Sequence, residues 1–144
     1  YTTSRELLAY IRAETPADRQ QLVTDLFEKM SFYDNRVLAT SARKRADGRY
    51  DVTLDLHASK QYADGKGKET AATMDDWVEI GVFANGPSGK ERDQKVLYLQ
   101  RHHITTAAPT ITVTVDAKPD EAGFDPYNKL IDRVSEDNRR KVTM

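Results

Sequence analysis

Cysteine is absent from the 144 residues of this sequence. A disulfide framework, a thiol nucleophile and a thiolate metal site are therefore excluded. Long hydrophobic runs are absent too, because the longest uninterrupted apolar stretch extends only from Leu7 to Ile11. A helix that spans a bilayer needs roughly 20 apolar residues. We therefore expect a soluble domain that does not itself insert into a membrane.

The sequence also has no excess of charge of one sign. Its 22 Lys and Arg residues and 23 Asp and Glu residues give a formal net charge of −1. Because the chain offers no general attraction to phosphate backbones, we expect no nucleic acid partner. The length is typical of a single domain. The chain starts at Tyr1 without an initiator Met or a leader, so we interpret it as a piece of a longer polypeptide.

Two short amphipathic helices are predicted near the start, over residues 4–13 and 16–30. Thr3 and Glu6 have the spacing of a capping box, and Pro16 suits the first position of the second helix. Part of their apolar surface is predicted to stay exposed, as an interface with a missing upstream domain. The apolar positions are Leu7, Leu8, Ile11, Leu22, Val23, Leu26, Phe27 and Met30.

Beyond these helices the apolar residues alternate with polar ones, as in a half-buried strand. The alternation is clearest over residues 49–60, which we pair with residues 36–45 as an antiparallel hairpin. Three more strands are predicted around Trp77–Phe83, Val96–Leu99 and Thr110–Val115. Strands at this spacing with Gly-rich turns predict a mainly β fold, an antiparallel immunoglobulin-like sandwich of six or seven strands.

We divide this single domain into three parts. Residues 1–31 form a helical connector, residues 32–118 form the sandwich, and residues 119–144 form a C-terminal tail that packs on the sandwich rather than within it. The segment Tyr127–Arg133 is predicted to form about two helical turns.

No catalytic, cofactor-binding or metal-ligating residue is predicted in this chain. His102 and His103 are adjacent, so on a strand they point to opposite faces and cannot easily bind one ion. We interpret them and His57 as solvated histidines. The motif H-E-x-x-H and the nucleophile and phosphate-loop motifs are absent. The acidic pair Asp75–Asp76 is interpreted as solvated loop charge.

The aromatic residues fall into two groups. Those within apolar periodic segments are predicted to be core residues: Phe27, Trp77, Phe83 and Tyr98. Those at predicted element boundaries are candidates for an interface, because exposed aromatics often anchor partners: Tyr33, Tyr62, Phe124 and Tyr127.

Two stretches resemble a known family. The first runs from Asp18 to Val37 and includes Thr24-Asp25-Leu26-Phe27-Glu28-Lys29 and Tyr33-Asp34-Asn35-Arg36; the second is Gly123-Phe124-Asp125-Pro126-Tyr127-Asn128-Lys129-Leu130-Ile131-Asp132-Arg133. They are similar to the C-terminal end of bacterial aminopeptidase N-like zinc peptidases (gluzincins), especially those fused to an ABC-transporter-type permease region. Residues 47–52 and 77–83 also fit the pattern.

The resemblance implies a non-catalytic C-terminal accessory domain that docks on the upstream catalytic domain of the same polypeptide, in a membrane-anchored bacterial protein. It implies zinc in that upstream domain and none in this chain. Two alternatives remain. The chain could be a stand-alone sandwich that binds a peptide or carbohydrate through Tyr62 and Tyr127, or a hydrolase in its own right that depends on His57 or His102.

Overall fold

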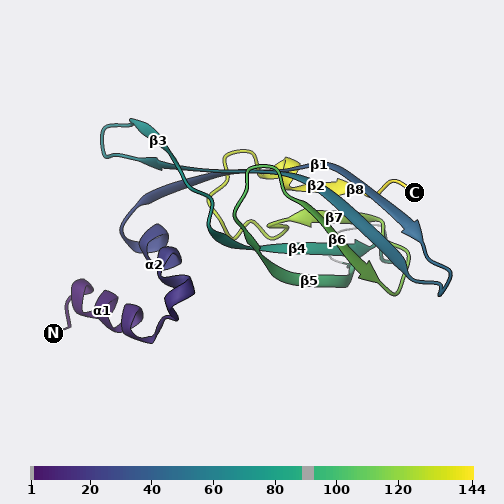
Figure 1. The fold of residues 1–144 in the computed structure, drawn as a ribbon, viewed down its shortest axis with the longest axis horizontal. Helices are drawn as coiled ribbons and strands as arrows, with labels where there is room; N and C mark the ends of the chain where they lie inside the picture. Colours follow the sequence, from purple (N-terminus) through teal and green to yellow (C-terminus); the bar gives the residue numbers. More distant parts are fainter. Residues whose placement is uncertain (1, 89–92) are drawn as a thin grey trace.

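A computed structural model describes residues 2–88 and 93–144. Its helical elements are α1 (Ser4–Glu14), η1 (Ala17–Arg19), α2 (Gln20–Phe27) and η3 (Ser135–Asn138). Its strands are β1 (Met30–Lys44), β2 (Tyr50–Ala63), β3 (Glu69–Ala72), β4 (Asp76–Ala84), β5 (Lys95–Ile104), β6 (Thr110–Val115), β7 (Glu121–Phe124) and β8 (Arg139–Lys141). The chain is mainly β, as predicted (Figure 1).

The first predicted helix is confirmed, and the second is shorter than predicted. Thr3 and Glu6 form the capping box, with each side chain hydrogen-bonded to the backbone N–H of the other residue. After Pro16 comes the short 3₁₀-helix η1, and α2 then ends at Phe27. Met30 already belongs to β1. The predicted helical end at Met30 is therefore wrong, because the inward row of a strand begins at Ser31.

The strands form two antiparallel sheets. One contains β1, β2 and β3 in that order, with β6 also paired to β2, and the other has the order β5-β4-β7-β8. Buried side chains from both sheets, such as Leu54 of β2 and Ile80 of β4, form one core cluster. The described residues thus make eight strands, more than the six or seven predicted.

The predicted hairpin is confirmed but is longer than expected. Lys44 pairs with Tyr50 next to the turn, and Met30 pairs with Ala63 at the far end. At Leu38 the register shifts, as at a β-bulge. Buried positions before it have odd numbers and those after it have even numbers, so both halves of β1 keep one face on the core.

The C-terminal tail contributes strands to the sheet, which contradicts the prediction that it lies outside the sandwich. β7 pairs with β4, with Phe124 opposite Ile80, and β8 pairs with β7. Residues 127–133 are not helical. Instead Asp125 accepts hydrogen bonds from the backbone N–H groups of Lys129 and Leu130, which closes a turn after β7.

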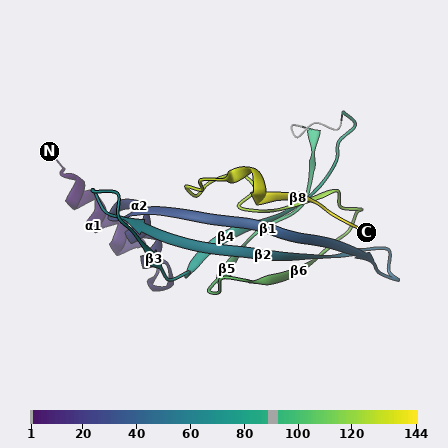
Figure 2. The same ribbon diagram turned by 90° about the horizontal axis from the view of Figure 1, so that it is seen from above.

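The helices α1, η1 and α2 together are called the arm below. The arm lies at one end of the molecule, beside the end of the β1–β2 hairpin that carries β3 (Figures 1 and 2). The C-terminus lies toward the other end (Figure 1). Among the described residues, no helix has the length and apolar character needed to cross a bilayer.

Candidate functional site

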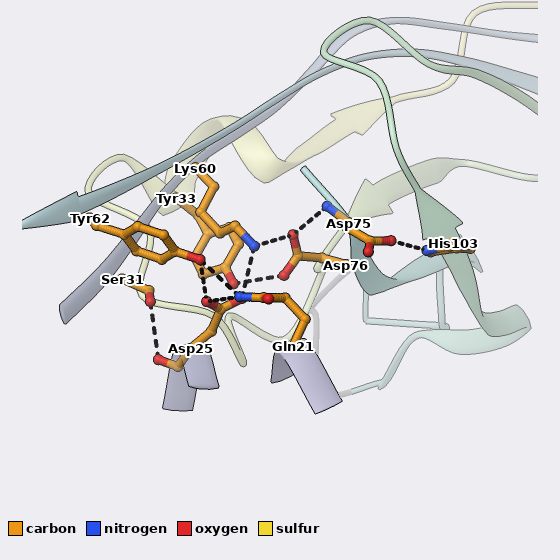
Figure 3. A network of polar contacts seen from close by, with 9 residues as sticks. All are labelled: Gln21, Asp25, Ser31, Tyr33, Lys60, Tyr62, Asp75, Asp76 and His103. Carbon is orange, nitrogen blue, oxygen red and sulfur yellow. Dashed lines mark hydrogen bonds and ion pairs between the residues drawn. The ribbon is translucent and has the colours of Figure 1, made fainter. Parts of the chain in front are cut away.

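A buried lysine lies where α2, β1, β2 and β4 meet (Figure 3). The side chain of Lys60 has no exposed surface. Its Nζ donates a hydrogen bond to Asp25 Oδ2 at 2.8 Å and lies 2.9 Å from Asp76 Oδ2. One ammonium group therefore bridges a carboxylate from the arm and a carboxylate from the second sheet.

Two tyrosines complete this cluster, here called the Lys60 network: Lys60, Asp25, Asp76, Tyr33 and Tyr62. The Tyr33 hydroxyl donates to Asp76 Oδ1 at 2.9 Å, and the Tyr62 hydroxyl donates to Asp25 Oδ1 at 2.7 Å. All four carboxylate oxygens of the network therefore accept a hydrogen bond or face the ammonium group. This is the condition under which buried charges become tolerable.

Residues close to Asp25 and Asp76 in the sequence donate further hydrogen bonds to these carboxylates. Gln21, one turn before Asp25 on α2, donates from Nε2 to Asp25 Oδ1 at 3.0 Å. The backbone N–H of Asp75 donates to Asp76 Oδ2 at 3.1 Å. In addition, the Ser31 hydroxyl donates to the backbone carbonyl of Asp25, so the end of α2 is also fixed to β1 (Figure 3).

The network holds its groups in defined charge states. Burial alone would lower the pKa of Lys60, but hydrogen bonds and charge from Asp25 and Asp76 outweigh it and hold that pKa above its usual value. Burial, followed by the charge of Asp76, raises the pKa of Tyr33. Burial and the hydrogen bond to Asp25 raise the pKa of Tyr62. At neutral pH the lysine is charged and both tyrosines are neutral donors.

The hairpin register explains why these side chains meet. Tyr33 lies directly opposite Lys60 in the β1–β2 ladder, and Ser31 lies opposite Tyr62. Directly opposed residues have Cβ atoms close enough for contact. Lys60 keeps its proton and its side chain has no exposed surface. The network joins the arm, through Asp25, to both sheets.

The four aromatic residues predicted as an interface do not form one surface. Tyr33 and Phe124 are buried, so their predicted exposure is wrong, because both point inward from strands. Tyr62 is half-buried in the Lys60 network. Tyr127 is exposed, and its ring makes a T-shaped contact with the ring of Phe83. The cavity that Tyr62 lines, beside the end of α2, does not include Tyr127.

Other residues also depart from prediction. Among the aromatic residues predicted to be core, Phe83 is buried, Trp77 and Tyr98 are half-buried, and Phe27 is 56% exposed. Phe27 is the last residue of α2 and its side chain faces away from the sandwich core, so its predicted burial is wrong. Asp76, interpreted as a solvated loop charge, is buried in the network.

Sequence reasoning therefore missed the three charged members of the network, Asp25, Lys60 and Asp76. One signal for them was present. Leu54, Leu56 and Ala58 mark the inward row of β2, and Lys60 continues that row at the same spacing of two. A lysine in such a row needs buried acidic partners.

The histidines make separate contacts. His103 stacks on Trp77 and hydrogen-bonds Asp75, while His102 hydrogen-bonds the Tyr98 hydroxyl. Burial lowers the pKa of His102. Within residues 2–88 and 93–144, no group of three or more His, Asp or Glu side chains is arranged to hold a metal ion.

A cavity of about 200 Å³ lies between α2, β4 and the tail. Gln21 and Asp76 line it, so it adjoins the Lys60 network. Its other walls include apolar side chains of α2 and Leu130 of the tail.

The arm exposes a set of apolar side chains, which confirms the prediction that its apolar surface is only partly covered. Val23 is buried, but Leu26 is 59% exposed. The exposed set, called the arm surface below, consists of Leu7, Tyr10, Leu22, Leu26 and Phe27 of the arm together with Met30 at the start of β1.

Comparison with protein-family models, with curated proteins and with solved structures returns no match to this chain.

Proposed function

We propose that this chain is the non-catalytic C-terminal accessory domain of a bacterial, membrane-associated, aminopeptidase N-like zinc metallopeptidase protein, with an immunoglobulin-like sandwich. Its partner is the upstream catalytic domain of the same polypeptide, which the arm contacts. The resemblance of residues 18–37 and 123–133 to that family supports the proposal. Both stretches border the junction between the arm and the sandwich, since Asp25 lies in the first and Leu130 in the second.

The observation that carries the docking role is the arm surface. Six large apolar side chains are exposed on two short helices and the strand that follows them. Soluble proteins rarely leave contiguous apolar patches uncovered, and such patches mark interaction sites. Asp25 joins α2 to the Lys60 network, so the α2 part of the arm surface is presented in a fixed orientation, which lowers the entropic cost of binding.

In this proposal zinc is bound upstream, by residues that lie outside this chain. The described residues contribute an interface and a rigid junction to the assembly. Neither role requires an acid, a base or a nucleophile on the arm surface.

Two observations test the proposal. First, the sequence encoded directly before Tyr1 should contain H-E-x-x-H and several long apolar spans. A signal peptide directly before Tyr1 would instead favour a stand-alone binding module.

Second, the separately produced upstream region should bind this chain in calorimetry, and Leu26→Asp should weaken binding about tenfold or more. Leu38→Asp is the matched control, because Leu38 is an exposed leucine on β1 outside the arm. Equal affinity for wild type, Leu26→Asp and Leu38→Asp would contradict docking through the arm.

A further inference from the structure

The cavity between α2, β4 and the tail has mainly apolar walls. Leu22 and Leu26 line it from α2, Leu130 lines it from the tail, and Trp77 and Val78 line it from β4. Its volume of about 200 Å³ exceeds that of engineered apolar cavities of about 150 Å³ that bind benzene. The cavity therefore has room for a small apolar group.

Five acidic side chains line this cavity, and four of them have partners other than Lys129 and Arg101. Asp76 is paired with Lys60, and Asp125 accepts from two backbone N–H groups. Asp75 is hydrogen-bonded to His103. Asp18 is exposed and lies 3.9 Å from Arg19. None of these four carboxylates requires a cation from a ligand.

Three basic side chains line the cavity. The Arg19 guanidinium lies 5.0 Å from the centroid of the Trp77 ring. Lys129 and Arg101 share the fifth acidic side chain, Glu79, whose Oε2 is buried without a hydrogen-bond partner among the described residues. Lys129 Nζ donates to Glu79 Oε1 at 2.6 Å, and Arg101 Nε lies 3.7 Å from the same oxygen. One carboxylate therefore faces two cations. The distance to Arg101 is too long for a hydrogen bond, and Arg101 makes no other ion pair in the described part of the chain. Its side chain is 53% exposed, so its donors are open to a ligand at the cavity.

We infer that this cavity binds a monocarboxylate with a small apolar body. The carboxylate pairs with the Arg101 guanidinium, whose planar donors match it in a bidentate geometry, while Lys129 stays paired with Glu79. The apolar body lies between the leucines of α2 and Leu130. A free acid and the C-terminal residue of a peptide share this chemistry.

Trp77 provides the measurement, because it is the only tryptophan of the chain and lines the cavity. We would titrate the intact chain with isocaproate, isohexanol and isohexylamine, which share one carbon skeleton and differ in the head group. The indole N–H resonance of Trp77 and its fluorescence report binding. Isocaproate should bind about tenfold more tightly than the alcohol, and the amine should bind most weakly.

Variants of Arg101 separate the carboxylate contact from the apolar contact. Arg101→Gln should abolish the preference of isocaproate over isohexanol, and Arg101→Lys should retain part of it. Arg43→Gln is the matched control, since Arg43 is an exposed arginine on β1 that does not line the cavity. The folded state of each variant is verified by the dispersion of its amide spectrum.

Two results would overturn the inference. One is the absence of a saturable change at Trp77 with isocaproate, and the other is an unchanged preference for isocaproate in Arg101→Gln. A peptide ending in leucine, with a free or an amidated C-terminus, distinguishes the two ligand sources. Tighter binding of the free-terminus peptide than of isocaproate assigns the site to a chain terminus, and the reverse assigns it to a free acid. The chain alone is used throughout, so the outcome is independent of the proposed docking role.

Discussion

Lys60 shows how a single charged residue can be accommodated inside a sandwich. Its neighbours in the inward row of β2 are Leu54, Leu56 and Ala58. Desolvation of an ammonium group costs several kcal/mol, and close partners offset that cost only with good geometry. Asp25 and Asp76 provide those partners from two different elements. The stability of the fold therefore depends on α2 and β4 both packing against Lys60.

The first prediction concerns this dependence. Lys60→Met keeps much of the side-chain length but leaves Asp25 and Asp76 buried near each other without a cation. We expect the free energy of unfolding to fall by about 3–5 kcal/mol, measured by urea denaturation. Lys68→Met is the control, because Lys68 is exposed in the turn before β3, and it should change stability by less than about 0.5 kcal/mol. Similar losses in both variants would show that the network does not stabilise the fold.

The second prediction concerns alkaline pH. The fold raises the pKa of Tyr33 above 10.0 and that of Lys60 above 10.5. The unfolded chain therefore releases these protons first, so stability is fully present below about pH 10 and decreases as the pH rises further.

Tyr33→Phe tests the tyrosine contribution, because it removes the titrating hydroxyl while the ring is kept. It should be less stable at pH 8, since Asp76 Oδ1 loses its donor. Its stability should then decrease less steeply than that of wild type between about pH 9 and about pH 11. Equal slopes in the two proteins, measured by denaturation at each pH, would contradict the raised pKa of Tyr33.

At the scale of elements, sequence patterns predicted the strands with aliphatic inward rows. β6 was predicted over Thr110–Val115, where Val113 and Val115 are buried. The first half of β1 was missed because its inward positions are Ser31, Tyr33 and Asn35, which carry no hydrophobic alternation. Tyr33 of the Lys60 network and its neighbour Ser31 thus occupy inward positions where an aliphatic residue would have revealed the strand in the sequence.

Short strands were missed for a different reason. β3, β7 and β8 have only three or four residues each, too few for a period of two to be recognised. β7 is nonetheless central, because it pairs with β4 on one side and β8 on the other. Its place depends on long-range pairing, which local propensity does not encode.

The third prediction tests the register of β2. Leu54 has no exposed surface and belongs to the core shared by both sheets. Leu54→Ala should lower the free energy of unfolding by about 2–5 kcal/mol, since it removes buried methyl groups and leaves a cavity. Leu38→Ala is the matched control on the outer side of β1, with an expected change below about 0.5 kcal/mol. An unchanged denaturation midpoint for Leu54→Ala would contradict the register.

At the scale of the whole molecule, the arm has two unequal parts. α1 buries none of its residues, whereas α2 buries Val23 and Asp25. The main link between them is Arg12, whose guanidinium donates to Gln20, Thr24 and Glu28. The sequence predicted both helices from their caps and apolar stripes. The sequence could not show that α2, and not α1, is fixed to the sandwich. That attachment depends on the contact between Asp25 and Lys60, which are far apart in the sequence.

The fourth prediction follows from this difference. Removal of residues 1–15 deletes α1 and the bonds of Arg12, which are exposed or half-buried, so the free energy of unfolding should fall by about 1 kcal/mol or less. Removal of residues 1–29 also deletes Asp25 and leaves Lys60 with one carboxylate, and the loss should exceed about 3 kcal/mol. Urea denaturation of both truncated chains measures the difference. Equal stability of the two truncated chains would mean that α2 does not stabilise the sandwich. The docking proposal would then lose its argument that α2 is held in a fixed orientation.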